Sequence, residues 1–201
     1  MILMRKNCEM KGVINILILV GKTCSGKDTI QNELIKRGME PVVSYTTRPP
    51  RHGEVDGKTY HFISESEFIC RKESGFFAET TSYNVAVNGG ETWHYGSALE
   101  DLSRNKVMIV NPEGLKVLKK NINLNPIAFY IMADEETIWN RLRQRGDNAE
   151  EARRRLNADE DDFADINKYI DFSFRNDLGI KPEIIAEMIL CTYLKTMEEV
   201  N

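Results

Sequence analysis

Residues 21–28 read Gly21-Lys22-Thr23-Cys24-Ser25-Gly26-Lys27-Asp28 and separate two segments of different periodicity. Residues 13–20 form an apolar run rich in β-branched side chains, too short to cross a membrane and typical of a buried parallel strand. Residues 29–37 have helical spacing, and Gly38 is placed to end that helix. Strand, glycine-bounded loop and helix, in that order, form the setting that a phosphate-binding loop needs.

The loop also has the chemistry to bind an anion. Gly21 and Gly26 allow the backbone to turn its N–H groups inward, the start of the helix adds a partial positive charge, and Lys27 adds a full one. The usual pattern continues with Ser or Thr, whose hydroxyl binds Mg²⁺, but Asp28 stands in that position here. The alternative is a glycine-rich turn that binds nothing, and the flanking strand and helix argue against it.

The composition indicates one domain without a charge-driven partner. The chain has 201 residues, enough to bury a sizeable core, and its formal net charge is −4. An acidic balance argues against non-specific binding to nucleic acid or to an anionic membrane. The cysteines have no paired spacing, which favours a reduced cytoplasmic chain over a disulfide framework or a zinc site; they are Cys8, Cys24, Cys70 and Cys191. Residues 1–12 loosely resemble the start of a secretion signal, but the apolar run that follows has no cleavage site, so we do not expect export. We expect these residues to be a frayed end.

A second informative stretch, residues 42–62, reads VVSYTTRPPRHGEVDGKTYHF. It begins as a strand, and the two prolines after Arg48 hold the backbone extended. Arg48 and Arg51 on such a stiff segment suit a phosphate with two or more free oxygens, and Tyr60 adds a hydroxyl donor. Taken alone, the two arginines fit a solvated turn better than a phosphate clamp.

These two stretches resemble the guanylate kinase family. The family's loop reads Gly-Pro-Ser-Gly-Ser-Gly-Lys-Ser-Thr, which residues 21–29 follow with substitutions, and its pattern Ser-x-Thr-Thr-Arg-x-Pro-Arg-x-Gly-Glu-x-x-Gly-x-x-Tyr-x-Phe appears nearly whole in residues 44–62. The likeness implies an α/β fold: a doubly wound parallel sheet core flanked by helices, a small mixed β subdomain that binds the acceptor, and a helical lid. It also implies a Mg²⁺-assisted reaction in which ATP phosphorylates GMP or dGMP, giving ADP and GDP or dGDP.

The resemblance divides the single domain of residues 1–201 into three parts. The core is expected at about 12–43 and 98–201, the acceptor-binding subdomain at about 44–97, and the lid at about 141–163. The implied partners are the small molecules ATP and GMP, with no nucleic acid and no membrane. Whether the chain is a monomer or a homo-oligomer stays open.

Carried over by position, the resemblance assigns the GMP-binding residues. The clamp on the acceptor's phosphate is expected to consist of Arg48, Arg51, Tyr60 and Tyr95. Glu54 resembles the acid that holds these arginines in place. The contacts to guanine are expected from Ser44, Glu79 and Ser97. Guanine presents two adjacent donors that one carboxylate accepts together, whereas adenine offers no such pair, so Glu79 fits this role.

The donor side follows in the same way. The residues implied for ATP binding are Gly21, Thr23, Cys24, Ser25, Gly26, Lys27, Asp28 and Thr29, with Asn176 beside the adenine. The implied catalytic residues are Lys27, Arg48, Arg145 and Arg155. Phosphoryl transfer through a dissociative transition state needs cations around the transferring group rather than a nucleophilic side chain. The alternative for the arginine-rich segment is a solvated helix whose arginines pair with acids such as Asp159 and Asp161, and we expect it to hold for Arg143 and Arg153.

Two departures from the family pattern concern the metal. The family carries Asp-x-Asp at the end of the strand that we expect at 106–110, but the first Asp is Asn111 here, a position also implied at the GMP site. The chain thus gains a carboxylate at Asp28 and loses one at Asn111. We expect both to face the same Mg²⁺, with Asp28 binding it directly or through water and Asn111 holding a metal-bound water. In the alternatives, Asp28 caps the helix while Thr29 supplies the hydroxyl, or the site is impaired.

Local sequence patterns predict a hairpin, several helices and the state of one cysteine. Residues 84–93 predict a hairpin longer than the family's, turning at 88–90, that is either a harmless insertion or one through which Trp93 or His94 alters access to the base. Residues 97–104 and 182–189 predict helices, the second with a core-facing apolar stripe. Asp134 is expected to cap a helix that Gly146 ends. Cys24, between two lysines at a helix start, is expected to favour the thiolate.

Two other functions compete with this one. The first is a kinase of similar fold that acts on another nucleoside monophosphate. The second is a non-catalytic guanylate-kinase-like binding module. Such modules usually lose the loop lysine, and Lys27 is present here.

Overall fold

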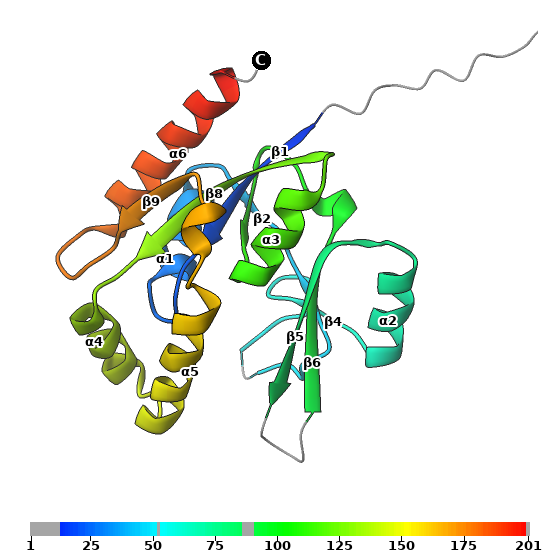
Figure 1. Cartoon of the computed structure of the whole chain (residues 1–201), viewed down its shortest axis with the longest axis horizontal. Coiled ribbons are helices and arrows are strands. Elements are labelled where there is room, and N and C mark those ends of the chain that lie inside the picture. The colour runs from blue at the N-terminus through cyan, green and yellow to red at the C-terminus, as the bar shows by residue number, and fades with distance from the viewer. Residues whose placement is uncertain (1–12, 52, 86–90, 200–201) are drawn as a thin grey trace, which may run out of the picture.

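The computed structural model of the chain describes residues 13–51, 53–85 and 91–199. The expected frayed end at 1–12 and the predicted hairpin turn at 88–90 lie outside these residues. Figure 1 shows two sheets, each accompanied by helices. None of the helices in the described part is long and apolar enough to span a lipid bilayer.

The larger sheet is five-stranded, with every paired strand parallel, in the order β2-β7-β1-β8-β9. Its strands are β1 (Ile14–Val20), β2 (Glu40–Pro41), β7 (Lys106–Ile109), β8 (Leu124–Met132) and β9 (Phe172–Arg175). The helices that accompany it are α1 (Lys27–Lys36), α3 (Pro112–Lys120), α4 (Glu135–Arg145), α5 (Ala149–Asp162) and α6 (Pro182–Glu199). The α/β class expected from the sequence is confirmed.

Both faces of β1 are buried. Ile16 and Ile18 pack with α3 and the segment after α5, whereas Leu17 and Leu19 pack with α1 and α6. Because successive side chains on a strand point to opposite faces, a strand covered on both sides needs an unbroken apolar run. This explains the composition of residues 14–20.

The smaller sheet is mixed and is inserted between β2 and β7. Its order is β4-β3-β6-β5, with β3 and β4 parallel and the other pairs antiparallel. The elements of this part are β3 (Tyr45–Thr46), β4 (His61–Phe62), α2 (Glu65–Glu73), β5 (Phe77–Val85) and β6 (Glu91–Ala98). Strands β5 and β6 form the expected hairpin, paired out to Val85 and Glu91.

The prediction of a helix at residues 97–104 is wrong. Strand β6 continues to Ala98, and only Leu99–Asp101 forms a short 3₁₀ turn. Ser97 pairs with Glu79 across the hairpin, so cross-strand pairing overrides the local helical pattern.

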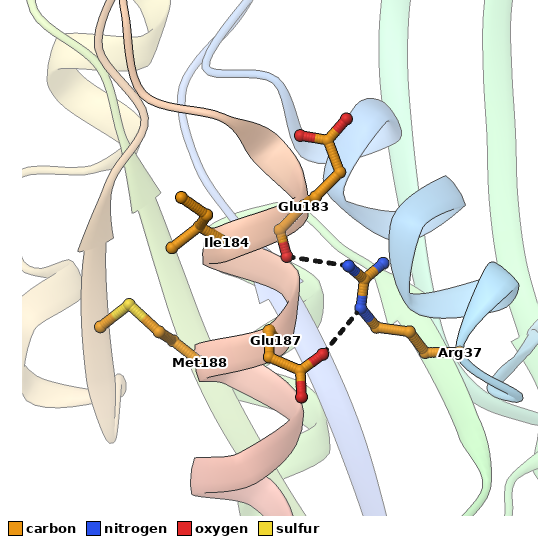
Figure 2. Close-up of a pocket in the computed structure, with 5 residues that line it drawn as sticks. All are labelled: Arg37, Glu183, Ile184, Glu187 and Met188. Carbon is orange, nitrogen blue, oxygen red and sulfur yellow. Dashed lines mark hydrogen bonds and ion pairs between the residues drawn. The ribbon is translucent and has the colours of Figure 1, made fainter.

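The apolar stripe expected on α6 is only half in the core. Ile185 and Ile189 are buried, but Ile184 is 55% exposed and Met188 is 51% exposed. Figure 2 shows the contact on one side of α6, where Arg37, at the end of α1, donates to the Glu183 carbonyl and the Glu187 carboxylate. Ile184 and Met188 point away from that contact.

Candidate active site

The loop between β1 and α1 is held tightly by its lysine and glycines. Lys27 Nζ donates to the carbonyls of Gly21 at 2.6 Å and Lys22 at 2.9 Å. A Cβ at Gly21 would come within 2.5 Å of the Ile131 carbonyl, and one at Gly26 within 2.2 Å of the Asn176 amide nitrogen. Both positions therefore require glycine.

The ammonium of Lys27 is poorly hydrated. Burial lowers the pKa of Lys27 from its ordinary value, while the charges of Asp28 and Asp159 act in the opposite direction. A cation withdrawn from water interacts more strongly with a nearby anion than an exposed one does. This is the electrostatic setting that phosphate binding needs.

A cavity of about 470 Å³ opens beside the loop. The residues expected at the ATP site that line it are Cys24, Gly26, Lys27, Asp28, Thr29 and Asn176, together with Arg145 of the lid. The other expected donor residues, Gly21, Thr23 and Ser25, belong to the same loop.

Asn176, which follows β9, is built into this cavity wall. Its side chain is 1% exposed and its Nδ2 donates to the Ser25 carbonyl at 2.8 Å. Its Oδ1 is buried and has no hydrogen-bond partner among the described residues, so it can accept a hydrogen bond from a bound group.

Arg141 has a positioning role that the sequence did not suggest. From α4 it donates to the carbonyls of Cys24 at 3.1 Å and Asn176 at 2.7 Å, which ties the loop to the end of β9. Although Arg141 begins the segment expected to form the lid, its spacing alone did not separate it from the other arginines there.

The two arginines expected to act on the transferring phosphate lie together. Arg145 donates twice to Asp147, at 2.8 and 2.6 Å, and Arg155 Nη1 lies 3.7 Å from the same carboxylate. Arg155 also donates to Glu151 at 3.0 Å. Arg143 and Arg153 are exposed, as the solvated-helix alternative predicts for them, but exposure does not set them apart, because the Arg145 side chain is also 58% exposed.

Two acids of α5 contact the loop, which the sequence did not predict. The Thr23 backbone N–H donates to Asp159 Oδ2 at 2.6 Å, and Lys22 Nζ lies 2.5 Å from Glu160 Oε1. The solvated-helix alternative had Asp159 pairing with arginines on an exposed face.

On the acceptor side, Arg48 is held by Glu54, as expected. The guanidinium donates to both Glu54 oxygens, at 2.9 and 2.7 Å, and Glu54 also accepts from the Arg51 backbone N–H at 2.6 Å. The buried charge of Arg48, whose side chain is only 3% exposed, is therefore paired. The Arg51 guanidinium, in contrast, makes no hydrogen bond or ion pair with the described residues and is exposed.

The two tyrosines of the expected phosphate clamp stand beside Arg48. Its guanidinium lies 5.4 Å from the centre of the Tyr60 ring, and the rings of Tyr60 and Tyr95 are 6.0 Å apart. Burial raises the pKa of Tyr60, and Asp28 of the phosphate loop is close enough to contribute to that rise. The residues expected to form the acceptor clamp therefore face the loop between β1 and α1.

The three residues expected to contact guanine converge. Glu79 is 7% exposed and pairs in register with Ser97, which hydrogen-bonds it, and the hydroxyls of Ser97 and Ser44 are 2.9 Å apart. Burial raises the pKa of Glu79 to about 7 although the Ser97 hydrogen bonds act in the opposite direction. A cluster of one carboxylate and two hydroxyls is suited to a polar, hydrogen-bonding ligand edge.

Asn111 is positioned as a helix cap. Its Oδ1 accepts from the Gly114 N–H at 2.8 Å, and its Nδ2 donates to the Tyr83 hydroxyl at 2.6 Å. Tyr83, on the inserted hairpin, was not expected near the site. It pairs with Trp93 across the hairpin, whereas His94 bonds Ser82 and stacks on Phe68 of α2.

Asp28 does not cap α1, so that alternative is wrong. The capping position is Gly26, without a side-chain hydrogen bond, and Asp28 is exposed. In the part of the chain that the structure describes, no three His, Cys, Asp or Glu side chains gather in a way that could hold a metal.

The expected thiolate at Cys24 is also wrong. Partial burial raises the pKa of the Cys24 thiol, and Arg145 and Lys27 only partly offset this effect. The side chain packs against the apolar cluster that contains Ile138 and Leu142. Cys24 also has φ of 57°, the sole left-handed backbone among the non-glycine residues described.

Comparisons with known proteins bear on the family of the chain and on its fold. The family described as guanylate kinase matches residues 14–179. The guanylate kinase of Syntrophus aciditrophicus is 32% identical over 163 residues, which is 80% of this chain and 78% of that protein. That of Rickettsia prowazekii is 32% identical over 185 residues, or 90% and 92%. The crystal structure of guanylate kinase from Anaplasma phagocytophilum has a TM-score of 0.64 at 23% identity, covering 92% of this chain and 87% of that one, and supports the fold.

Proposed function

This chain belongs to the guanylate kinase family, and from that premise we propose that it transfers the terminal phosphate of ATP to GMP or dGMP, giving ADP and GDP or dGDP. We place this reaction in the cytoplasm. The observation that carries the choice of acceptor is the buried carboxylate of Glu79 beside the hydroxyls of Ser97 and Ser44.

Glu79 gives the acceptor site its preference. The ionised carboxylate accepts hydrogen bonds from the ring N–H and the amino group of guanine, which are adjacent donors. Adenine presents an acceptor where guanine presents the ring N–H, so its binding would leave a buried carboxylate oxygen facing an acceptor. The Glu79 carboxylate therefore disfavours an adenine nucleotide as the acceptor.

The acceptor's phosphate is bound by the clamp next to Glu54. Arg48 is oriented by both oxygens of Glu54 and keeps N–H donors beyond those that Glu54 uses, while the Arg51 guanidinium is not engaged by a described side chain. Tyr60 and Tyr95 add hydroxyl donors on the same side. The acceptor oxygen is thereby directed toward the phosphate loop.

On the donor side, positively charged groups bind the phosphates and stabilise the transferring group. The loop N–H groups and Lys27 bind the phosphates of ATP, Asn176 accepts from the adenine amino group, and Arg145 and Arg155 stabilise charge on the transferring group. Mg²⁺ bound with ATP would neutralise phosphate charge, and Asp28 is the residue that would hold it. One exposed carboxylate suits this ion, which keeps several waters and binds largely through substrate phosphates.

The binding-module alternative lacks support in the geometry. A module has no need of a poorly hydrated loop lysine or of arginines gathered beside the loop, and Lys27, Arg145 and Arg155 provide both.

A coupled assay of ADP release tests the proposal, with GMP, dGMP, AMP, CMP and UMP compared as acceptors. We expect GMP to be used best and AMP poorly. The Lys27→Ala variant should lose about a hundredfold or more in turnover because it removes a preplaced cation from the phosphates, with an unchanged circular dichroism spectrum. Equal use of AMP and GMP by the wild-type protein would refute the acceptor assignment.

A further inference from the structure

We propose that Asp159 of the lid competes with the donor's phosphates for the phosphate loop, so that nucleotide must displace this carboxylate in order to bind. The inference rests on the proposed function only in taking the loop between β1 and α1 as a phosphate site. It assigns Asp159 a role in setting donor affinity.

The contact itself is that of an anion on a phosphate loop. Asp159 Oδ2 accepts from the Thr23 backbone N–H at 2.6 Å, a short distance of the kind seen in charge-assisted hydrogen bonds. A carboxylate oxygen and a phosphate oxygen make the same demand on a loop N–H, so both cannot use the Thr23 donor together. Asp159 also acts on Lys27, whose pKa it raises against the larger effect of burial.

The contact is part of a two-point attachment between α5 and the loop. The neighbouring acid, Glu160, pairs with Lys22 at 2.5 Å, so consecutive residues of the helix engage consecutive residues of the loop. Two such contacts fix the position of the helix against the loop, which a single surface ion pair would not do.

The same helix face carries the cation that the reaction needs. Arg155 precedes Asp159 by four residues, which puts both side chains on one face of α5. Any shift of α5 that withdraws Asp159 from Thr23 also moves Arg155 relative to the loop. The lid therefore exchanges an internal anion for a nucleotide phosphate in the same movement that repositions its arginine.

Neutralising Asp159 should tighten donor binding, because it removes both the competitor and a negative charge near the phosphates. Isothermal titration calorimetry with ADP and with inorganic tripolyphosphate measures this directly. We expect Asp159→Asn, and likewise Asp159→Ala, to bind both probes roughly five- to tenfold more tightly than the wild-type protein, as expected for one nearby charge at an intermediate dielectric. GMP affinity should not change.

Asp161→Asn is the matched control, because Asp161 is exposed on the same helix and its side chain makes no hydrogen bond or ion pair with the described residues. It removes the same charge and should shift either affinity by less than about twofold. Unchanged or weaker binding of tripolyphosphate by both Asp159 variants would overturn the proposal. An equal gain in Asp161→Asn would also overturn it, by showing that net charge alone is responsible. Both results are distinct from failure of the proposed function, which the acceptor assay detects as absent GMP phosphorylation in wild-type protein.

Discussion

Glu54 holds Arg48 with both carboxylate oxygens, at 2.9 and 2.7 Å, while the Arg48 side chain is only 3% exposed. Removing one member of a buried ion pair leaves the other charge without a partner. We therefore expect Glu54→Ala to lower the free energy of unfolding by about 3 kcal/mol in urea titrations. The control is Glu67→Ala, which breaks the partly exposed Arg71–Glu67 pair of α2 and should cost about 0.5 kcal/mol or less.

The same pair predicts an acid transition. Its hydrogen bonds to Arg48 lower the pKa of Glu54 from 4.5 to about 2. Because the folded-state pKa is depressed, the stabilisation is present above pH 4.5 and is lost as the pH falls through 2. The stability difference between wild type and Glu54→Gln should shrink across that range, and a difference that stays constant from pH 6 to pH 2 would contradict this assignment.

Glu79 predicts that GMP binding depends on pH. Its pKa of about 7 means that the carboxyl group is mostly protonated below neutrality, whereas guanine needs the ionised form. The dissociation constant for GMP should rise as the pH falls from 8 to 5.5, approaching about tenfold per pH unit below 7. Glu79→Gln should bind more weakly at pH 8, by roughly 2–3 kcal/mol, and keep only the shallower pH dependence that the GMP phosphate contributes, since its second pKa is about 6.

Glu79 also predicts the pH dependence of stability, with the opposite sign to Glu54. Its folded-state pKa is raised, so its favourable contribution is present below pH 4.5 and is lost as the pH rises through 7. The melting temperature of Glu79→Gln should therefore improve relative to wild type between pH 5 and pH 8. A relative decline over that interval would show that the carboxyl group is ionised at little cost in the folded protein.

Cys24 predicts a substitution that relieves strain. A non-glycine residue in the left-handed region costs about 1 kcal/mol, and glycine avoids this cost. Cys24→Gly should be more stable than Cys24→Ala, since both lose the sulfur contact and only alanine keeps the strain.

Because burial raises the pKa of the Cys24 thiol, iodoacetamide should modify Cys24 more slowly than the exposed Cys70, as measured by mass spectrometry.

The metal assignment predicts coupling between Asp28 and Asn111. If the chain has moved one carboxylate from the strand end to the loop, Asp28→Ser and Asn111→Asp should each weaken Mg²⁺-dependent turnover, and the double variant should recover much of the loss. Strictly additive losses would argue against the exchange. Because both polar atoms of the Asn111 side chain are already bonded, to Gly114 and Tyr83, thermal melts of each variant are needed as a control for changes at the α3 cap.

Local signals made much of the fold predictable. The apolar run and the glycine-bounded loop identify β1 and the start of α1, and the helix that begins after Asp134 does end at Gly146, as expected. These features work because strand burial, capping and left-handed helix ends depend on a few neighbouring residues. The convergence of Ser44, Glu79 and Ser97 came instead from the resemblance, since no local rule joins positions so distant in the sequence.

The misses have a common physical cause, which is tertiary contact. Ser97 lies in a strand because Glu79 pairs with it. Ile184 is exposed although it belongs to the same predicted apolar stripe as the buried Ile185 and Ile189. Asp159 reaches Thr23 across most of the chain, and an acid among other acids carries no signal of that contact. Cys24 was misjudged because its cationic neighbours are visible in the sequence, whereas the apolar cluster against which its side chain packs comes from residues far along the chain, and burial outweighs the nearby cations.

The insertion of the smaller sheet between β2 and β7 has a consequence for the order in which the chain folds. Glu40 pairs with Lys106, so the edge of the large sheet closes only after the intervening residues, which form the smaller sheet, have brought their two ends together. Closing a long flexible loop is entropically costly, and a two-residue strand offers little to offset it. We therefore expect β2 to be the last core strand to gain protection in pulsed hydrogen exchange, after β1 and β8, so that completion of the core sheet reports that the smaller sheet has already folded.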